Sequence, residues 1–294
     1  MRVTVGIPFF NAEKTLANAL RSVFAQTFTE WELLLVDDGS TDQSLAIARA
    51  LDDPRVSVLS DGRNLGLPTR LNQIAQLASG EYYARFDADD LMHCERLARQ
   101  FEYIETHPEC SVLDTGMYAL DMNDAIHGKR DCLPMVIEPA AWVEHGVPNH
   151  SSVFGRTSWF RRNPYDATFS RAEDHELWCR TFHEHSFAHI PEPLLFYREF
   201  GVPTLNKYLE TWKTDRRIIR RYGEGIVGRR TSAWLYWKAW AKSCLWWVIV
   251  LCRQEQHIIH RRNIPLTGEE LAAAMEELAT VLHTPLPGID DCNS

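Results

Sequence analysis

The amino-acid sequence predicts an α/β protein with a mostly parallel sheet that is flanked by helices. Two observations predict this fold. Short apolar runs rich in β-branched residues alternate with segments of helical period, and polar or glycine-rich turns follow the apolar runs. With 294 residues, of which 45% are apolar, the chain can bury one large core and add a smaller appendage. In such sheets, ligands bind beyond the carboxyl ends of the strands.

The first strand is expected at residues 3–7, a β-branched run that Pro8 closes. A helix capped by Asn11 is expected next. Its apolar face consists of Leu16, Leu20, Val23 and Phe24. Further strands are expected at 31–36, 56–59 and 111–120, with a strand-like stretch at 149–154, and further helices at 44–51, 96–106 and 173–184.

An acidic cluster follows the apolar run 82–86. Asp87, Asp89 and Asp90 repel one another, so water, a cation or hydrogen-bond donors must neutralise them. Asp87 and Asp89 are two positions apart, so in an extended chain both carboxylates lie on the same side and can bind one ion. The pattern favours a divalent metal with a phosphate on its far side. Taken in isolation, a solvated acidic turn is the alternative.

Four consecutive strand-to-helix turns bring unusual residues to one edge of the predicted sheet. They are residues 8–11, 37–40, 61–68 and 87–90. Phe10 offers an aromatic face for a base, and Asp38 can accept the N3–H of uracil or thymine. A tight turn with a helix cap is the alternative for 37–39. The sequence contains no GxxxxGK[ST], so a P-loop nucleotidase is not indicated. Its GxGxxG, at residues 223–228, lies in a region expected to be helical and does not follow a predicted strand, so a dinucleotide dehydrogenase is not indicated either.

The net charge and the cysteines further narrow the functional class and the expected location of the protein. A formal net charge of -9 argues against nucleic-acid binding, although an acidic protein can hold a nucleotide through a metal. The seven cysteines are scattered without a CxxC pair, which indicates reduced thiols. The first strand begins at once and leaves no room for a signal peptide. We therefore expect a cytoplasmic protein.

Between residues 2 and 200 the chain contains the motifs VGIPFFNAE at 5–13, SVFAQT at 22–27, LVDDGSTD at 35–42, NLGL at 64–67 with Asn72, GEY at 80–82, DADD at 87–90, NHSS at 149–152 and AEDHELWCR at 172–180. Taken together, these motifs resemble those of the inverting glycosyltransferases of family 2, which have the GT-A (Rossmann-like) fold. The resemblance implies transfer of a sugar from a nucleotide diphosphate, UDP above all, to an acceptor hydroxyl with inversion. The acceptor it implies is a glycan or a lipid-linked glycan, in cell-surface polysaccharide assembly.

The resemblance also implies roles for individual residues. Asp89 is implied as the principal ligand of Mn²⁺ or Mg²⁺, with Asp87 as a further ligand or a contact to the ribose, and Asp174 as the catalytic base. The implied nucleotide-binding residues are Pro8, Phe10, Asn11, Glu13, Asp38, Asn64, Asp87 and Ala88. The residues implied near the acceptor or donor sugar are His150, Glu173 and Trp178. A purely structural role for His150 stays open.

The sequence departs from the family pattern at two positions. Glu199 follows Tyr197-Arg198 where many members have His, and Leu71 stands where some members have an Arg that contacts the diphosphate. The arginines that could replace this contact are Arg63, Arg70 and Arg198.

We expect a catalytic domain at 1–204, with a nucleotide-binding half (1–95) and an acceptor-binding half (96–204), and a helical region at 205–294. Five of the ten Trp residues fall within 234–247, where the apolar stretch is shorter than the roughly 20 residues that span a bilayer. One hypothesis makes this stretch a buried helix or a homodimer interface. The other places it at the membrane interface, on the inner face of the cytoplasmic membrane, because Arg residues lie just upstream.

Two other functions stay open. A sugar-phosphate nucleotidyltransferase shares the architecture but needs a basic, glycine-rich loop, which residues 8–11 do not provide. A non-catalytic nucleotide-sugar binding protein would have lost its base, whereas Asp174 is present. Histidines 183, 185, 189, 257 and 260 are expected on the surface, because no Cys or Glu completes a zinc site with them.

Overall fold

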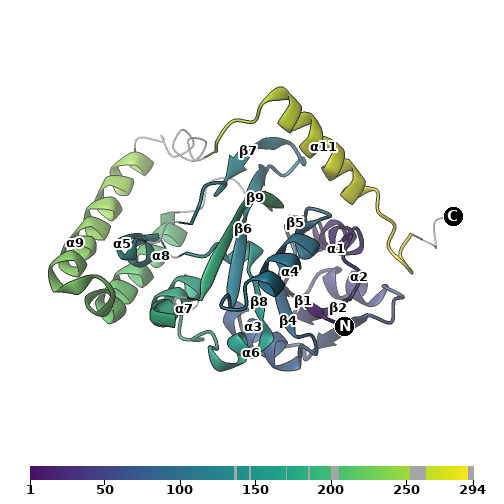
Figure 1. Cartoon of the computed structure of the whole chain (residues 1–294), viewed down its shortest axis with the longest axis horizontal. Coiled ribbons are helices and arrows are strands. Elements are labelled where there is room, and N and C mark those ends of the chain that lie inside the picture. Colours follow the sequence, from purple (N-terminus) through teal and green to yellow (C-terminus); the bar gives the residue numbers. More distant parts are fainter. Residues whose placement is uncertain are drawn as a thin grey trace.

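The computed structural model describes residues 1–135, 138–145, 147–169, 171–184, 186–199, 205–251 and 263–290. Its elements surround one central sheet, with α9 at one end of the molecule and α11 along another side (Figure 1). The strands are β1 (Val3–Phe9), β2 (Trp31–Asp37), β3 (Val56–Ser60), β4 (Tyr82–Arg85), β5 (Leu91–Met92), β6 (Val112–Leu120), β7 (Ile126–Arg130), β8 (Phe154–Arg156) and β9 (Phe187–Arg198). The α-helices are α1 (Leu16–Phe24), α2 (Ser44–Arg49), α3 (Leu67–Leu77), α4 (Arg96–Thr106), α5 (Pro139–His145), α6 (Thr157–Arg162), α7 (Glu173–Thr181), α8 (Leu205–Ile218), α9 (Glu224–Leu251) and α11 (Gly268–Leu282).

All strands of the described chain belong to one sheet, in the order β3-β2-β1-β4-β8-β6-β9-β5, with β7 paired to β6. The strands β3, β2, β1 and β4 are mutually parallel. The strand β8 is antiparallel to β4 and to β6, whereas β6 and β9 are parallel. The predicted parallel arrangement is thus confirmed for the first four strands, and the later strands make the sheet mixed.

The sheet has an apolar core on each face, because alternate residues of a strand point to opposite sides. On β2, Leu33 and Leu35 belong to the cluster that contains residues of α1, α2 and α4. Leu34 and Val36 belong to the cluster that contains residues of α3, α6 and α7. Helices therefore cover both faces, as the sequence predicts.

Strand β1 runs past Pro8 to Phe9, two residues beyond its predicted end. The reason lies in its neighbour β4, which ends at Arg85 opposite Gly6. On that side, the carbonyl of Gly6 accepts a hydrogen bond from the N–H of Phe86. Pro8 lies two residues later and faces the same side, where β4 has already ended, so an N–H at this position would find no strand partner. The missing N–H of proline therefore costs the sheet nothing here.

The prediction that Asn11 caps α1 is wrong. Asn11 has a φ of 50°, in the left-handed region, and its side-chain oxygen accepts the backbone N–H of Thr41. The helix begins later, at Leu16. Asn11 therefore joins the turn after β1 to the turn after β2.

Two later boundaries also differ from expectation. Residues 149–154 were expected to be strand-like, but His150–Ser152 form a 3₁₀ turn and β8 begins at Phe154. The hydroxyl of Ser152 accepts the N–H of Thr115 and donates to its carbonyl, so a side chain takes the place of a strand ladder. The helix expected at 173–184 ends at Thr181 and continues as a 3₁₀ turn.

The C-terminal helices pack on two different parts of the sheet domain. Helices α8 and α9 are joined by a π-helical stretch, Ile219–Gly223, and Leu235 of α9 packs with Val143 of α5. Gly228, with a φ of 77°, interrupts α9. Helix α11 packs elsewhere, where Leu278 contributes to the cluster that covers β5. No helix in the described chain is both long enough and apolar enough to cross a bilayer.

Candidate active site

A cavity of about 590 Å³ lies beyond the carboxyl ends of β1 and β4. Six of the eight residues that the sequence assigns to the nucleotide line it, namely Pro8, Phe10, Asn11, Glu13, Asp87 and Ala88. Asp89, the implied metal ligand, lines it too. Phe10 is 49% exposed, so its ring is accessible to a ligand. We call this space the nucleotide cavity.

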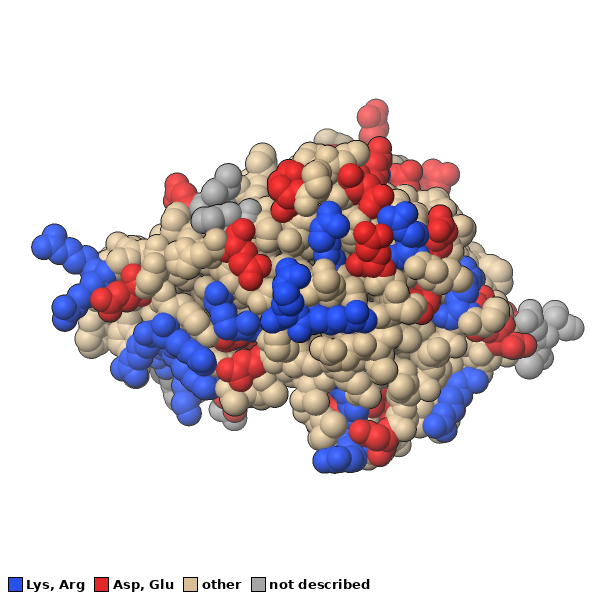
Figure 2. Space-filling view, turned by 60° about the horizontal axis from the view of Figure 1, so that its bottom comes forward, with Lys and Arg blue, Asp and Glu red and all other residues tan. Residues whose placement is uncertain are grey.

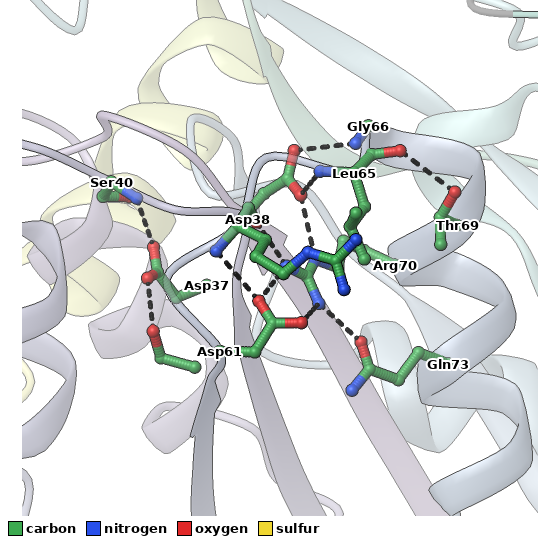
Figure 3. Close-up of polar contacts among 11 residues, drawn as sticks. Asp37, Asp38, Ser40, Asp61, Leu65, Gly66, Thr69, Arg70 and Gln73 are labelled. Atoms are coloured by element: carbon green, nitrogen blue, oxygen red, sulfur yellow. Dashed lines mark hydrogen bonds and ion pairs between the residues drawn. The ribbon is translucent and has the colours of Figure 1, made fainter.

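Asp38 and Asn64 are not among the residues that line this cavity. The Asp38 carboxylate accepts hydrogen bonds from the N–H groups of Leu65 and Gly66, at 2.7 and 3.1 Å, and from Nε of Arg70 at 2.9 Å (Figure 3). Asp38 is buried, and these contacts tie the turn after β2 to the loop before α3.

Arg70 belongs to the same hydrogen-bond network. Its side chain is 1% exposed, and its guanidinium contacts the carboxylate of Asp61 at 2.6 Å, the side chain of Gln73 at 2.9 Å and the carbonyl of Arg63. Arg63, Arg70 and Arg198 line neither this cavity nor the larger one described below. The arginines that line the larger cavity are Arg85, Arg130 and Arg171.

The acidic cluster after β4 brings three carboxylates together. Oxygens of Asp87, Asp89 and Asp90 all lie within 4.8 Å of one another. Arg85 contacts both oxygens of Asp87, and Asp90 accepts the backbone N–H of Arg198. Burial and the neighbouring charge of Asp87 raise the pKa of Asp89 to about 6 and that of Asp90 well above its usual range.

These residues fit a hard divalent cation such as Mn²⁺ or Mg²⁺. All the donors are carboxylate oxygens, which both ions prefer. One buried oxygen of Asp90 has no hydrogen-bond partner in the described chain. A cation would offset the repulsion that raises the pKa of Asp89, and Asp89 lines the nucleotide cavity.

A second pair of acidic residues opens α7. Ala172, just before this helix, has φ 54° and ψ 34°, a left-handed conformation that costs a non-glycine residue about 1 kcal/mol or more. Glu173 and Asp174 follow; Glu173 is buried, whereas Asp174 is partly exposed. Burial, with the neighbouring charge of Asp174, raises the pKa of Glu173 to about 7. The two carboxyl groups therefore occupy different environments.

His150 is a buried part of this network. Its Nε2 lies 2.9 Å from the hydroxyl of Tyr165, and its Nδ1 lies 4.0 Å from a carboxyl oxygen of Glu173. Burial, and then the charge of Arg85, lower the pKa of His150 well below its usual range, so the imidazole is neutral at pH 7. Trp178 is fully buried and lines neither cavity; it packs edge-on against His150.

A larger cavity, of about 1120 Å³, contains Asp174, Glu173 and His150 in its wall. Asp87 lines this space as well as the nucleotide cavity. A side chain of the acidic cluster therefore separates two cavities, one with Phe10 and Asp89 and the other with Asp174. We call the larger space the acceptor-side cavity.

Sequence reasoning missed two pairs of this cavity wall. One is Arg85 with Asp87, although Arg85 stands inside the run that precedes the acidic cluster. The other is Asp114 with His189, whose Oδ1 and Nδ1 atoms lie 2.9 Å apart. The prediction that His189 lies on the surface is wrong, because its side chain is 6% exposed. A carboxylate within the apolar run 112–120 was the signal that a buried partner exists.

Among the other histidines, His183 is exposed, as predicted. The prediction for residues 185, 257 and 260 lies outside the described residues.

Comparison with known proteins identifies the family. A family model described as "Glycosyl transferase family 2" matches residues 4–169, more than half of the chain. The chain belongs to glycosyltransferase family 2. It is therefore a glycosyltransferase, as the motifs predict.

Two curated relatives support this assignment to glycosyltransferase family 2. Putative glycosyltransferase EpsE of Bacillus subtilis is 35% identical over 189 residues, which are 62% of this chain and 67% of that protein. Amylovoran biosynthesis glycosyltransferase AmsE of Erwinia amylovora is 31% identical over 240 residues, or 78% of this chain and 87% of that one. The second of these relatives is named for amylovoran biosynthesis.

Solved structures of other glycosyltransferases share the fold. S. aureus TarS 1-349 in complex with UDP-GlcNAc matches with a TM-score of 0.60 at 19% identity, over 74% of this chain and 66% of that one. Mannosyltransferase PcManGT from Pyrobaculum calidifontis, in complex with GDP-Man and Mn²⁺, matches with a TM-score of 0.59 at 14% identity, over 96% and 85%. This chain spans about two thirds of the TarS chain. At these identities the likeness shows the fold, and the GT-A prediction is confirmed.

Proposed function

We propose that this glycosyltransferase is metal-dependent and inverting, and moves a sugar from a nucleoside diphosphate, UDP above all, to an acceptor hydroxyl. One observation carries the proposal: Asp87 lines both the nucleotide cavity and the acceptor-side cavity, and Asp174 lines the second. A donor bound over Phe10 and Asp89 places its sugar toward the space that Asp174 faces.

Sugar transfer makes two demands on the protein, namely stabilisation of the departing diphosphate and removal of a proton from the attacking hydroxyl. For the first, Asp89 and Asp87 would hold Mn²⁺ or Mg²⁺, whose charge neutralises that of the leaving diphosphate. For the second, we assign Asp174 as the base. Its carboxylate lies in the first turn of α7, where the helix dipole favours a negative charge.

Glu173 and Asp174 divide their roles by environment. The raised pKa of Glu173 keeps a large fraction of this group protonated near pH 7, so it can donate a hydrogen bond to a sugar hydroxyl or to its neighbour. Asp174 faces the acceptor-side cavity and is left to accept the proton.

The acceptor we propose is a glycan or a lipid-linked glycan, in cell-surface polysaccharide assembly. Support comes from relatives such as AmsE, which is named for amylovoran biosynthesis. We place the reaction in the cytoplasm, which suits the buried free thiols of Cys94, Cys110 and Cys179. Lys14 is the only cation in the described lining of the nucleotide cavity, which disfavours a triphosphate and hence a nucleotidyltransferase.

The test is a panel of UDP-, dTDP- and GDP-sugars incubated with the full chain, with and without Mn²⁺, in which release of the nucleoside diphosphate is measured. Slow, Mn²⁺-dependent release from a UDP-sugar is the expected result. Binding without release from any donor would favour a non-catalytic binding protein instead. Equal release in the presence of a chelator would remove the metal from the proposal.

A further inference from the structure

Helix α9 carries apolar side chains on two opposite faces. Leu235 is 2% exposed and packs inward with Val143 and Ile219, and Ala239, four residues later, packs against the same cluster. The opposite face is open to solvent. Its exposed members are Trp234, Trp237, Trp240 and Leu245, at 58%, 69%, 43% and 61%. We call these four residues the aromatic face.

Such a face needs a partner. Exposed apolar patches mark interaction sites. The inner face of α9 already contacts the protein, and among the described side chains of this helix the aromatic face is the apolar surface left exposed.

The charge around this face indicates which partner it fits. Residues 205–251 contain ten Lys and Arg but three Asp and Glu, in a chain whose net charge is -9. Lys and Arg side chains gather at the left-hand end of the face in Figure 2, the end at which Figure 1 places α8 and α9. Within the described chain, no carboxylate pairs with Arg220, Arg229 or Arg230, all of which are exposed.

The arginines also lie against the aromatic rings. The guanidinium of Arg216 lies 4.3 Å from the ring centre of Trp240, and that of Arg220 lies 4.6 Å from the ring centre of Tyr236. Cations and indole rings are thus interleaved on one surface. This combination suits the headgroup region of a membrane, where Trp settles at the boundary and Arg meets anionic phosphates.

We propose that the aromatic face and its flanking arginines dock on an anionic phospholipid bilayer. The contact is peripheral, because no helix of the described chain can span a bilayer. A second copy of the chain is a poorer partner. A two-fold symmetric contact would place the same cationic surface against itself, and like charges oppose such a contact.

Docking at α9 would hold a lipid-linked acceptor near a helix that contacts the wall of the acceptor-side cavity. His145 of α5 and Thr211 of α8 line that cavity, and Glu144 of α5 pairs with Lys238 and Lys242 of α9 at 2.7 and 2.5 Å. The cavity wall and the docking helix are therefore directly connected. This consequence for a lipid-linked acceptor rests on the proposed function, whereas the docking itself does not.

The test is co-sedimentation of the full chain with vesicles of phosphatidylcholine alone or mixed with phosphatidylglycerol. We expect binding to the mixed vesicles that weakens at high salt. Arg229→Glu with Arg230→Glu should lower the partition coefficient at least about tenfold on the mixed vesicles. Trp234→Ser with Trp237→Ser should lower it by about tenfold or more at every salt concentration, because buried indole area is lost.

Matched controls use other exposed residues. Arg49→Glu with Arg162→Glu makes the same charge change on exposed arginines elsewhere, and Leu271→Ala with Met275→Ala removes exposed apolar area from α11. Both controls should bind as the wild type does. Unchanged UDP affinity in all variants shows that each is folded.

Three outcomes would overturn the docking proposal. The first is no binding of the wild type to the vesicles, and the second is equal binding of all variants. The third is a dimer, seen by sedimentation velocity, that the Trp double substitution dissociates while the protein binds no vesicles. None of these outcomes bears on sugar transfer, which the donor panel tests separately.

Discussion

Arg85 contacts both carboxylate oxygens of Asp87 at 2.5 Å, although its side chain is only 4% exposed. Burial opposes the charged form of Arg85, yet the charge of Asp87 raises its pKa above the usual value. Arg85 therefore stays protonated. Because Asp87 lines both cavities, this pair holds the boundary between the proposed donor and acceptor spaces.

Arg85→Met should impair both the fold and the donor site. Removing one partner of a buried pair leaves the other uncompensated, so we expect the free energy of unfolding to fall by about 3 kcal/mol. Mn²⁺-dependent UDP binding should weaken because Asp87 loses its orientation. Arg85→Lys keeps the charge but not the paired geometry, so its losses should be smaller. Urea unfolding and calorimetry measure the two effects, and a Met variant that matches the wild type in both would contradict this account.

Phe10→Ala should weaken UDP binding. The ring is half exposed at the nucleotide cavity, and a base stacked on an aromatic ring gains about 1 to 3 kcal/mol. Phe10→Tyr keeps the aromatic face and should bind UDP as the wild type does. Calorimetry with UDP compares the three proteins. Equal affinity of the Ala variant would place the base elsewhere.

Arg70→Met should destabilise the loop before α3. The change leaves buried Asp38 without its cation, and we expect a loss of about 3 kcal/mol in the free energy of unfolding. Arg70→Lys restores a charge but cannot contact Asp38, Asp61 and Gln73 together. The stability of the Lys variant should therefore lie between those of the wild type and the Met variant. If the Met variant unfolds at the wild-type urea concentration, the network does not stabilise the loop.

The first three strands are predictable from the sequence because short runs rich in apolar and β-branched residues alternate with segments of helical period. Their predicted bounds, 3–7, 31–36 and 56–59, agree with the structure within two residues. The stretch 149–154 was mispredicted because the hydroxyl of Ser152 hydrogen-bonds to the backbone of Thr115 in place of a strand ladder. The position of α11 rests on distant contacts, such as that of Glu270 with Lys129, which local pattern does not encode.

The candidate site also contains residues that the sequence predicts and residues that it does not. Phe10, Asp87 and Asp89 follow strand ends, so topology alone brings them to one edge. Tyr165 acts through a buried contact with a residue 15 positions away in sequence. No local pattern pairs Tyr165 with His150, and only the folded chain brings them together.

Glu173→Gln should change how stability depends on pH. The pKa of Glu173 is raised to about 7, above its ordinary value near 4.5, so the folded state retains a proton that the unfolded state has released. Wild-type stability should therefore fall as pH rises from about 4.5 to 7 and stay level above that for this group. Gln cannot ionise, so the variant should lack this decline and gain stability relative to the wild type at pH 8. Urea unfolding at pH 5 and pH 8 measures the difference. The same gain at both pH values would mean that ionisation of Glu173 is not its cause.

Asp174→Asn separates binding from chemistry. Asn keeps the size of the side chain and removes its capacity to accept a proton, so transfer should fall by about 10² to 10⁴. Mn²⁺-dependent UDP binding should persist, because Asp174 does not line the nucleotide cavity. Asp166→Asn makes the same change eight residues earlier, at a carboxylate that lines neither cavity and contacts Arg221. That control should retain turnover. Transfer at the wild-type rate by Asp174→Asn would require another base, and the loss of UDP binding would assign Asp174 to the donor site instead.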